Sequence, residues 1–199
     1  MGGKLLLATN NQGKVREYKS LFHNIPYELI TFAEQGNIAE VSEVCGSLEE
    51  NARLKATVVA DKSQLLTLAD DSGLEVNALG GEPGPLSARY AGEGASDRDR
   101  VNYLLSRLEG VPWEKRTARF RCVIAIATPD GKAEICSGEC QGFITFEARG
   151  KQGFGYDPIF YLPELGKTMA ELPLSVKNQV SHRGQAARKA YQLLERLGE

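Results

Sequence analysis

A short apolar run leads into two adjacent carboxylates in the stretch Leu65-Leu66-Thr67-Leu68-Ala69-Asp70-Asp71-Ser72-Gly73. An apolar run of this length is typical of a buried strand, and the polar residues after it predict the loop in which the strand ends. In α/β folds, ligands bind at loops that follow the carboxyl ends of strands. Because two neighbouring anions repel each other, Asp70 and Asp71 suit a bound divalent cation, or one carboxylate kept as a base.

The segments before this stretch alternate between strand and helix patterns. Apolar runs predict strands over residues 5–8 and 27–32. Apolar residues recur at helical spacing from Val15 to Phe22 and predict a first helix. The capping-box pattern Ser47-Leu48-Glu49-Glu50 begins a second helix, which continues to about Lys62. This half of the chain therefore predicts alternating strands and helices.

The second half predicts an antiparallel section. Residues 120–128 predict a strand, Asp130-Gly131 a hairpin turn, and residues 133–138 the returning strand. Residues 141–148 are expected to extend this hairpin into a meander. Further helices are predicted over residues 97–108 and after Ser181. The two halves together predict an α/β protein with a mixed sheet.

Composition excludes several classes of protein. The chain has 199 residues, which fits one domain, or one domain with two lobes. Its 24 basic and 26 acidic residues nearly balance, which argues against a protein that grips nucleic acid or an anionic membrane. No stretch approaches the ~20 apolar residues of a membrane span, and Met1-Gly2-Gly3-Lys4 lacks the regions of a signal peptide. The cysteines form no zinc-binding pattern, so we expect reduced thiols in a cytoplasmic protein.

Two basic segments could bind phosphate. Thr9-Asn10-Asn11-Gln12-Gly13-Lys14 links a strand to a helix, which makes it either a phosphate cradle or an ordinary N-cap turn with a solvated lysine. Asn51 and Lys55 share one face of the helix that begins at Ser47. Glu50 is either the partner of the Ser47 cap or a carboxylate facing a metal. Lysines 14 and 55 together with the paired acids suit a complex of Mg²⁺ with a polyphosphate.

Two later segments could bind a flat, acceptor-rich ligand. In Gly153-Phe154-Gly155-Tyr156-Asp157-Pro158, the glycines let the backbone approach a ligand closely, and either aromatic ring could stack on a base. The alternative is a tight turn whose aromatic residues belong to the core. Lys177 and Ser181-His182-Arg183 bring several donors together before a helix, and they could bind a purine carbonyl or a phosphate.

Together these motifs resemble the Ham1-like non-standard purine NTP pyrophosphatases, the family of inosine/xanthosine triphosphate pyrophosphatases. The resemblance covers nearly the whole chain, in order. The residues that carry it are Thr9, Asn11 and Lys14, Glu50 to Ala56, Ala69 to Leu74, Leu79 to Gly81, Pro83-Gly84, Ser87 to Tyr90, Gly153 to Pro158, and Ser181 to Arg183. Each motif is weak by itself, whereas their order is highly specific.

The resemblance implies a single domain over residues 1–199 with an elongated α/β fold. In that fold a mixed, twisted sheet is flanked by helices, and two lobes enclose a central substrate cleft. The resemblance also implies a homodimer and Mg²⁺-dependent hydrolysis of (d)ITP and (d)XTP to the monophosphate and pyrophosphate. Such an activity would remove deaminated purines from the nucleotide pool before they enter DNA or RNA.

The resemblance also implies roles for single residues. Asp71 would be the proton acceptor or a metal ligand. The substrate would be bound by Thr9, Asn10, Asn11, Gln12, Gly13, Lys14, Lys55 and Ser72, and its base by Phe154, Gly155, Tyr156, Asp157, Lys177, His182 and Arg183. Many members carry Glu-Thr-Gly shortly before the Glu-Asn-Ala helix, and here Glu43-Val44-Cys45-Gly46 stands there, with the spacing one residue short. Glu43 is expected to join Asp71 at the metal, with Glu49 and Glu50 as alternatives.

Two other functions stay open from the sequence. One is a related pyrophosphatase that acts on pyrimidine or modified nucleotides, which a substrate panel would separate. The other is a nucleotide-binding protein without catalysis, which would bind nucleotide and release no pyrophosphate. The intact pair of acids argues against the second. A nucleic-acid-binding module is disfavoured by the balanced charge.

Overall fold

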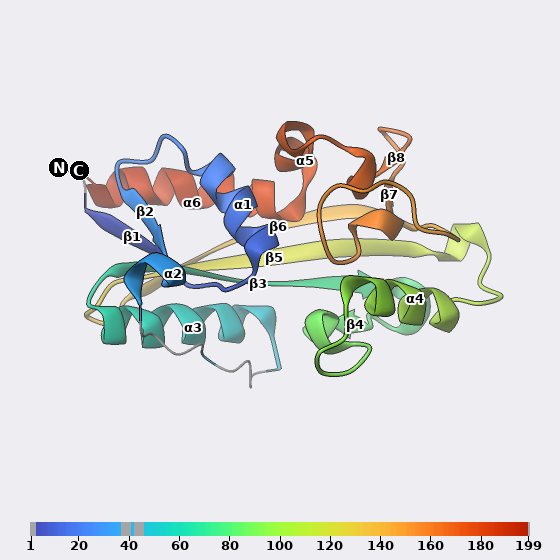
Figure 1. Ribbon diagram of the computed structural model, residues 1–199, viewed down its shortest axis with the longest axis horizontal. Helices are drawn as coiled ribbons and strands as arrows, with labels where there is room; N and C mark the ends of the chain where they lie inside the picture. Colours follow the sequence, from blue (N-terminus) through green and yellow to red (C-terminus); the bar gives the residue numbers. More distant parts are fainter. Residues whose placement is uncertain (1–2, 37–40, 42–45, 199) are drawn as a thin grey trace. The chain divides into compact units, whose positions relative to one another are not determined.

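The computed structural model describes residues 3–36, 41 and 46–198, and the chain divides into two compact units (Figure 1). The first unit comprises residues 1–71, 122–138 and 182–199, and the second comprises residues 72–121 and 139–181. Three long strands contribute residues to both units: β3 (Leu66–Val76), β5 (Thr117–Ala127) and β6 (Ala133–Ile144).

The first unit is built on parallel strands. β1 (Lys4–Leu7) pairs in parallel with both β2 (Glu28–Thr31) and β3, and the strand order continues as β2-β1-β3-β5-β6. The helices of this unit are α1 (Gln12–Leu21), α2 (Phe32–Gln35), α3 (Leu48–Ser63) and α6 (His182–Gly198). In Figure 1, α1 and α6 lie on one side of these strands and α3 lies on the other.

The first unit has two hydrophobic cores, one on each face of its strands. Leu5, Leu7 and Leu68 belong to the core that includes residues of α1 and α6. Leu6 and Ala69 belong to the core that includes residues of α3. Successive side chains of a strand point to opposite faces. The apolar run of β1 therefore supplies residues to both cores, and so does the apolar run of β3.

The second unit is mostly antiparallel. β4 (Pro83–Gly84) pairs with β3, β7 (Phe160–Leu162) pairs with β6, and β8 (Lys167–Thr168) pairs with β7. Its helices are α4 (Asp97–Arg107) and α5 (Leu174–Val180). Its core includes Leu74, Leu104, Phe120 and Phe160, and the two phenylalanine rings have centroids 4.5 Å apart. The predicted α/β fold, with a mixed sheet flanked by helices, is confirmed.

One expectation for β3 is wrong, because the strand does not end in a loop at the paired acids. It runs through them to Val76, and Leu74 and Val76 are fully buried beyond them. Gly73 is not a turn residue there. A Cβ on Gly73 would lie 2.4 Å from the carbonyl oxygen of Gly84, so β4 approaches the strand too closely for a side chain. The polar residues from Asp70 to Gly73 therefore lie within the strand, although their sequence pattern is typical of a loop.

The expected meander over residues 141–148 is also wrong. Residues 141–144 are the end of β6, and the next strand of this sheet is β7. Gly138, in the middle of β6, does not turn the chain. A Cβ there would lie 2.3 Å from the carbonyl oxygen of His182, so this glycine permits a close approach of α6 to the strand.

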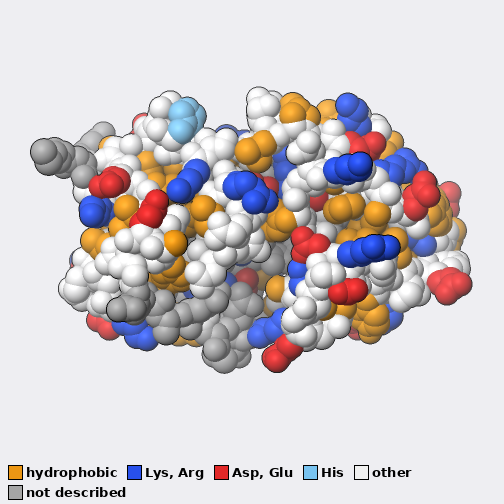
Figure 2. Space-filling model, in the orientation of Figure 1, with side chains coloured by type: hydrophobic (Ala, Val, Ile, Leu, Met, Phe, Trp, Pro, Cys, Tyr) orange, Lys and Arg blue, Asp and Glu red, His pale blue; other side chains and the backbone are white. Residues whose placement is uncertain are grey.

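The described surface carries charges of both signs. Figure 2 shows lysines and arginines interspersed with aspartates and glutamates on the face it displays. Among the residues that the structure describes, no helix combines the length and the apolar sequence needed to cross a bilayer.

Candidate active site

The turn before α1 is a capped helix start. The side chain of Asn11 accepts hydrogen bonds from the N–H groups of Gly13 and Lys14, at 2.9 and 3.1 Å. Thr9 Oγ1 in turn accepts from the N–H of Asn11 at 3.2 Å. The predicted N-cap is confirmed, but its lysine is not solvated, because Lys14 Nζ lies 3.0 Å from Asp70 Oδ1.

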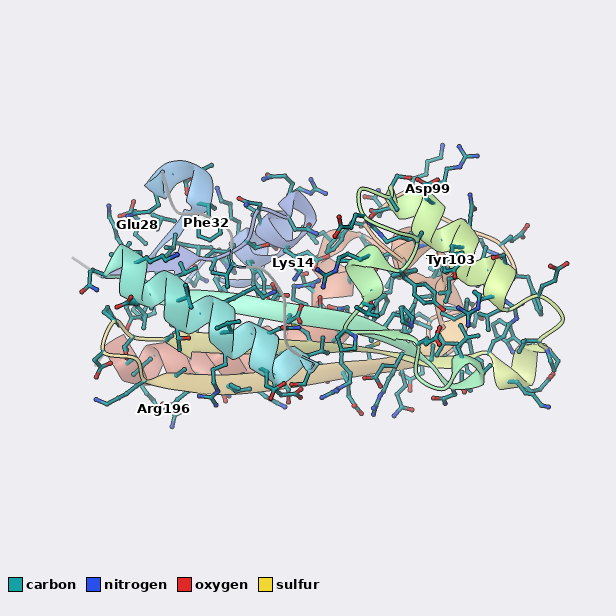
Figure 3. All side chains as sticks on the ribbon, turned by 90° about the horizontal axis from the view of Figure 1, so that it is seen from below. Lys14, Glu28, Phe32, Asp99, Tyr103 and Arg196 are labelled. Carbon is teal, nitrogen blue, oxygen red and sulfur yellow. The ribbon has the colours of Figure 1, made fainter. Side chains whose placement is uncertain are left out.

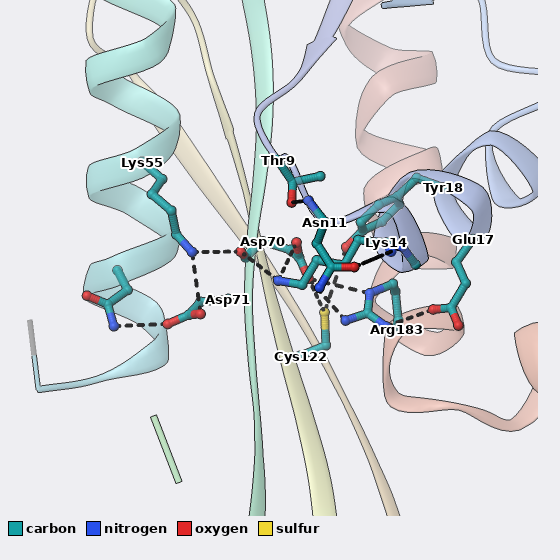
Figure 4. Close-up of polar contacts among 12 residues, drawn as sticks. Thr9, Asn11, Lys14, Glu17, Tyr18, Lys55, Asp70, Asp71, Cys122 and Arg183 are labelled. Carbon is teal, nitrogen blue, oxygen red and sulfur yellow. Dashed lines mark hydrogen bonds and ion pairs between the residues drawn. The ribbon is translucent and has the colours of Figure 1, made fainter. Parts of the chain in front are cut away.

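Asp70 lies at the centre of a buried ion-pair cluster, shown in Figure 4. Arg183 Nη2 lies 3.3 Å from Asp70 Oδ2, and Arg183 Nη1 lies 2.7 Å from Glu17 Oε2. Lys14 and Glu17 come from α1 and Arg183 from α6, the two helices on one face of the strands. We call Lys14, Glu17, Asp70 and Arg183 the ion-pair quartet. It holds two positive and two negative side chains, so its formal charges cancel.

The quartet changes the acidity of its neighbourhood. Burial raises the pKa of the Asp70 carboxyl, but the positive charges of Lys14 and Arg183 outweigh it and hold the pKa well below its usual range. Cys122 lies beside this carboxylate, with Sγ 3.8 Å from Asp70 Oδ2. Burial, followed by the negative charge of Asp70, raises the pKa of the Cys122 thiol to about 12. Asp70 is therefore an ionised, fully engaged carboxylate.

Asp71 faces the opposite helix. Asn51 Nδ2 donates to Asp71 Oδ2 at 2.9 Å, and Lys55 Nζ lies 3.4 Å from Asp71 Oδ1. Both partners come from α3, where their i, i+4 spacing places them on one helix face. Each oxygen of the Asp71 carboxylate is thus held from α3, which fixes the orientation of the group.

The two predicted phosphate-binding lysines meet at one backbone atom. Lys55 Nζ donates to the carbonyl oxygen of Asp70 at 3.0 Å, and Lys14 Nζ lies 3.4 Å from the same oxygen. Lys14 comes from α1 and Lys55 from α3, so helices on the two faces of the strands bring their ammonium groups together. Two cations at this point favour a polyanionic ligand.

The donor set for a metal ion in the described part of the chain includes a carboxylate beside the two lysines. Asp71 supplies it, whereas Glu43 lies outside the described residues. Glu50 Oε2 accepts from the Ser47 hydroxyl at 2.9 Å, which is the capping role considered for it. The described residues contain no group of three or more His, Cys, Asp or Glu side chains placed to hold a metal. Asp71 fits a Mg²⁺ site of the kind that substrate phosphates and water complete.

In the second unit, the segment Gly153 to Asp157 forms a tightly bonded loop, which we call the base loop. Asp157 Oδ2 accepts from the N–H of Phe154 at 2.9 Å and is also ion-paired with Lys177. Gly153 has φ +72°, and a Cβ there would lie 1.9 Å from Asp157 Oδ2. Lys177 Nζ lies 4.9 Å from the centroid of the Phe154 ring, which places a cation on that ring.

The two aromatic residues of the base loop lie in different environments. Tyr156 is buried in the core of the second unit, and its hydroxyl donates to the carbonyl oxygen of Ser87 at 2.9 Å. Burial raises its pKa. Phe154 is only half-buried. For Tyr156 the structure agrees with the core alternative, while Phe154 keeps surface that a flat ligand could contact.

The predicted site residues fall into two sets. The first unit holds Thr9 to Lys14, Lys55, Asp71, His182 and Arg183; the second holds Ser72, Phe154 to Asp157, and Lys177. His182 is buried at the start of α6 and Ser72 is half-buried in β3. Arg183, expected at the base, has its guanidinium bound to Glu17 and Asp70.

Sequence reasoning missed two residues, Glu17 and Asp97, and it named Asn51 without predicting its bond to Asp71. Asn51 carried a signal, since it shares a helix face with Lys55. Glu17 is three residues after Lys14 on α1, and nothing in the sequence pairs it with an arginine 166 residues away. Asp97 accepts from the N–H of Gly155 at 2.7 Å. Neither the predicted helix over residues 97–108 nor the segment from Gly153 to Pro158 indicates this contact.

Comparisons with known proteins agree with these observations. The family model described as "Ham1 family" matches residues 5–193. The chain is 50% identical over 194 residues to the dITP/XTP pyrophosphatase of Desulforamulus reducens, covering 98% of this chain and 96% of that protein. It is 51% identical over 183 residues to the dITP/XTP pyrophosphatase of Geobacter sulfurreducens, covering 92% of each. The structure of a HAM1 protein from Coxiella burnetii superposes with a TM-score of 0.88 at 40% identity, covering 98% of both chains.

Proposed function

The chain belongs to the Ham1 family, and from this we propose that it hydrolyses dITP, ITP, XTP and dXTP to the monophosphate and pyrophosphate. In the cell, this reaction would keep deaminated purines out of DNA and RNA. The observation that carries the proposal is the meeting of Lys14 and Lys55 beside an oriented Asp71 carboxylate. The names of two relatives at 50% and 51% identity support the substrate class.

In the proposed mechanism, Asp71 activates the attacking water. Asn51 and Lys55 fix its carboxylate, which would let it orient a water molecule and accept a proton from it. Lys14 and Lys55 would stabilise the negative charge that develops on the leaving pyrophosphate. Because Lys14 belongs to the formally neutral quartet and Lys55 is ion-paired with Asp71, these lysines alone would not balance a triphosphate.

Mg²⁺ would supply the remaining positive charge, and we propose that Asp71 and Glu43 hold it. When bound, the ion neutralises charge on phosphate oxygens and polarises the phosphate. Asp71 supports this assignment, because Mg²⁺ takes one or two carboxylates and accepts phosphate and water as its other ligands.

Selectivity for the base would come from hydrogen-bond donors that face position 6 of the purine. Hypoxanthine and xanthine present a 6-oxo acceptor, whereas adenine presents a 6-amino donor. We assign recognition of this group to Lys177, His182 and Arg183, with Phe154 stacking on the ring and Gly155, Tyr156 and Asp157 shaping the base loop. A donor facing adenine's amino group would leave polar groups unpaired, which discriminates strongly. The remaining contacts, from Thr9 to Lys14 and from Ser72, are assigned to the phosphates and sugar end of the substrate.

The proposal extends to the whole protein. Residues 1–199 would act as one functional domain, because the family match spans residues 5–193 and so includes both units. The family resemblance supports a homodimer. Cys122, Cys136 and Cys140 are free thiols, which agrees with a cytoplasmic location.

Analysis of the products tests the proposed reaction. ITP is incubated with the purified protein, with Mg²⁺ or with a chelator, and the products are separated. We expect IMP and pyrophosphate in the presence of Mg²⁺ and neither with the chelator. The appearance of IDP and inorganic phosphate, or binding of ITP without any product, would contradict the proposal.

A further inference from the structure

We propose that Asp97 is a positioning residue for recognition of the nucleobase, acting through the base loop. This inference rests on the proposed function, because it requires that Phe154 of this loop contacts the base. Asp97 belongs to α4, outside every segment that the sequence marked as a site. Its part would be to hold the loop in one conformation, without touching the substrate.

The carboxylate of Asp97 is itself fixed in orientation. Its Oδ1 is ion-paired with Arg100, one turn along α4, and its Oδ2 accepts from the N–H of Gly155 at 2.7 Å. Arg100 Nη1 donates to the carbonyl oxygens of Ala95 and Ala88, at 2.6 and 3.0 Å. A hydrogen bond from a backbone N–H to a carboxylate is charge-assisted and stronger than a neutral one. Asp97 therefore connects the base loop to the start of α4.

This connection is made at one of two glycines that flank Phe154 in the loop. Gly153 and Gly155 both have positive φ values, +72° and +61°, in the region that glycine enters readily. Phe154 lies between them. On one side its own N–H is held by Asp157, and on the other the N–H of Gly155 is held by Asp97. Without Asp97, the peptide after Phe154 loses its anchor on α4.

The position of an aromatic ring decides whether it can stack on a base. Rings stack within a narrow range of separations and offsets, so loosening one peptide beside Phe154 would weaken binding. The chemical step would change little, because the residues assigned to it belong to the first unit. The inference therefore predicts a change in KM with little change in kcat.

Two aspartates in the first turn of α4 allow a matched comparison. Asp97 bonds the loop, whereas Asp99 bonds the N–H and hydroxyl of Ser96 and completes the helix cap. Figure 3 labels Asp99, with Tyr103 one turn further along the same helix. Asp97→Ala and Asp99→Ala remove the same charge from the same turn. Asp97→Asn keeps an oxygen that can accept from Gly155 and is the conservative variant.

We expect Asp97→Ala to raise KM for ITP about fivefold to tenfold, with kcat within about twofold of wild type. Asp97→Asn should restore most of the affinity, and Asp99→Ala should leave KM unchanged. In a Phe154→Ala background, Asp97→Ala should raise KM no further, because the two residues act through one contact. Equal KM values for the two alanine variants, or fully additive effects with Phe154→Ala, would overturn the inference.

Amide hydrogen exchange provides a readout that does not depend on the reaction. Protection over residues 153–157 should fall in Asp97→Ala and stay at the wild-type level in Asp99→Ala. Unchanged protection in Asp97→Ala would also overturn the inference. If wild-type protein failed to hydrolyse ITP, the proposed function would fall, and that result is separate from the exchange of the loop.

Discussion

Asp70 and Asp71 are adjacent in sequence and differ in what surrounds them. Alternation along β3 directs Asp70 to the face covered by α1 and α6, and Asp71 to the face covered by α3. Asp70 is engaged by Lys14 and Arg183, while Asp71 is held by one amide and one lysine. This difference supports Asp71 as the proton acceptor and gives Asp70 the task of holding the lysine and arginine in place.

Replacement of Asp71 tests that division. We expect Asp71→Asn to lower kcat at least about 100-fold, because a positioned general base contributes on that scale. Nucleotide should still bind, which calorimetry would measure. Asp130→Asn, in the exposed turn between β5 and β6, is the control and should leave kcat unchanged. Near-normal turnover by Asp71→Asn would show that another group activates the water.

The pair of Glu17 and Arg183 allows a test of stability. Both side chains are almost fully buried, at 3% and 2% exposure. Glu17→Ala would leave a buried guanidinium with less compensation, so we expect the free energy of unfolding to fall by about 3 kcal/mol. Lys132→Ala, which breaks an exposed pair with Asp130, should leave it unchanged. Denaturant titration would measure both. Equal effects would contradict a buried, interdependent quartet.

Cys122 predicts how stability changes in alkali. Its pKa rises from the ordinary value of 9.0 to about 12 in the folded protein. A raised folded-state pKa gives stability that is fully present below the unfolded-state value and is lost as pH rises through the folded-state value. The free energy of unfolding should therefore fall between pH 9 and 12.

The matched variant is Cys122→Ser, which keeps the size of the side chain and does not titrate in this range. As pH rises, the free energy of unfolding of Cys122→Ser should fall less steeply than that of wild type. The two slopes should differ by up to about 1.4 kcal/mol per pH unit. Denaturant titrations at several pH values would measure the slopes. Identical slopes for wild type and Cys122→Ser would show that the thiol titrates normally.

At the scale of elements, the base loop depends on glycine for two different reasons. Gly153→Ala would introduce both backbone strain at φ +72° and a collision with the Asp157 carboxylate. Gly80→Ala is a control with strain alone, because φ is +65° and nothing lies within 4 Å of its Cβ position. Strain of this kind costs about 1–2 kcal/mol.

We expect Gly80→Ala to lower the free energy of unfolding by about 1–2 kcal/mol and Gly153→Ala to lower it by more. The Gly153 variant should also bind ITP more weakly, because its collision displaces Asp157 from Phe154 and Lys177. Thermal unfolding and KM measurements would check both results. Equal losses of stability, with KM unchanged in both, would contradict the packing of the loop.

Local signals predicted the elements that they determine directly. The Ser47 capping box placed the start of α3 correctly, because its hydroxyl accepts from the N–H of Glu50. The spacing of Asn51 and Lys55 predicted their shared face. The continuation of β3 could not be predicted in this way, because the partners that make its acids tolerable in a strand come from distant helices.

Long-range pairs are the part of the site that the sequence leaves open. Lys14 and Asp70 are 56 residues apart, and Asp97 and Gly155 are 58 residues apart. No spacing rule joins such residues, and their contacts exist because three-dimensional packing brings different elements together. The residue types predicted a phosphate site with a carboxylate, whereas the structure supplied the partner of each group.

At the scale of the molecule, charge argues for a small-molecule substrate. The formal net charge is −2, and charges of both signs are interspersed on the face shown in Figure 2. The positive side chains at the candidate site are paired with carboxylates. This arrangement suits a compact polyphosphate, and the described residues on the displayed face do not form the single-sign surface typical of proteins that bind long nucleic acids.

The central claim is that this protein selects and cleaves the triphosphates of deaminated purines, namely ITP, dITP and XTP, in preference to ATP. The most direct measurement is kcat/KM for pyrophosphate release from ITP, XTP, dITP, GTP and ATP under identical conditions with Mg²⁺. The account predicts that ITP, dITP and XTP exceed ATP by at least about 100-fold, since unpaired buried polar groups discriminate on that scale. Equal values for ITP and ATP would contradict it.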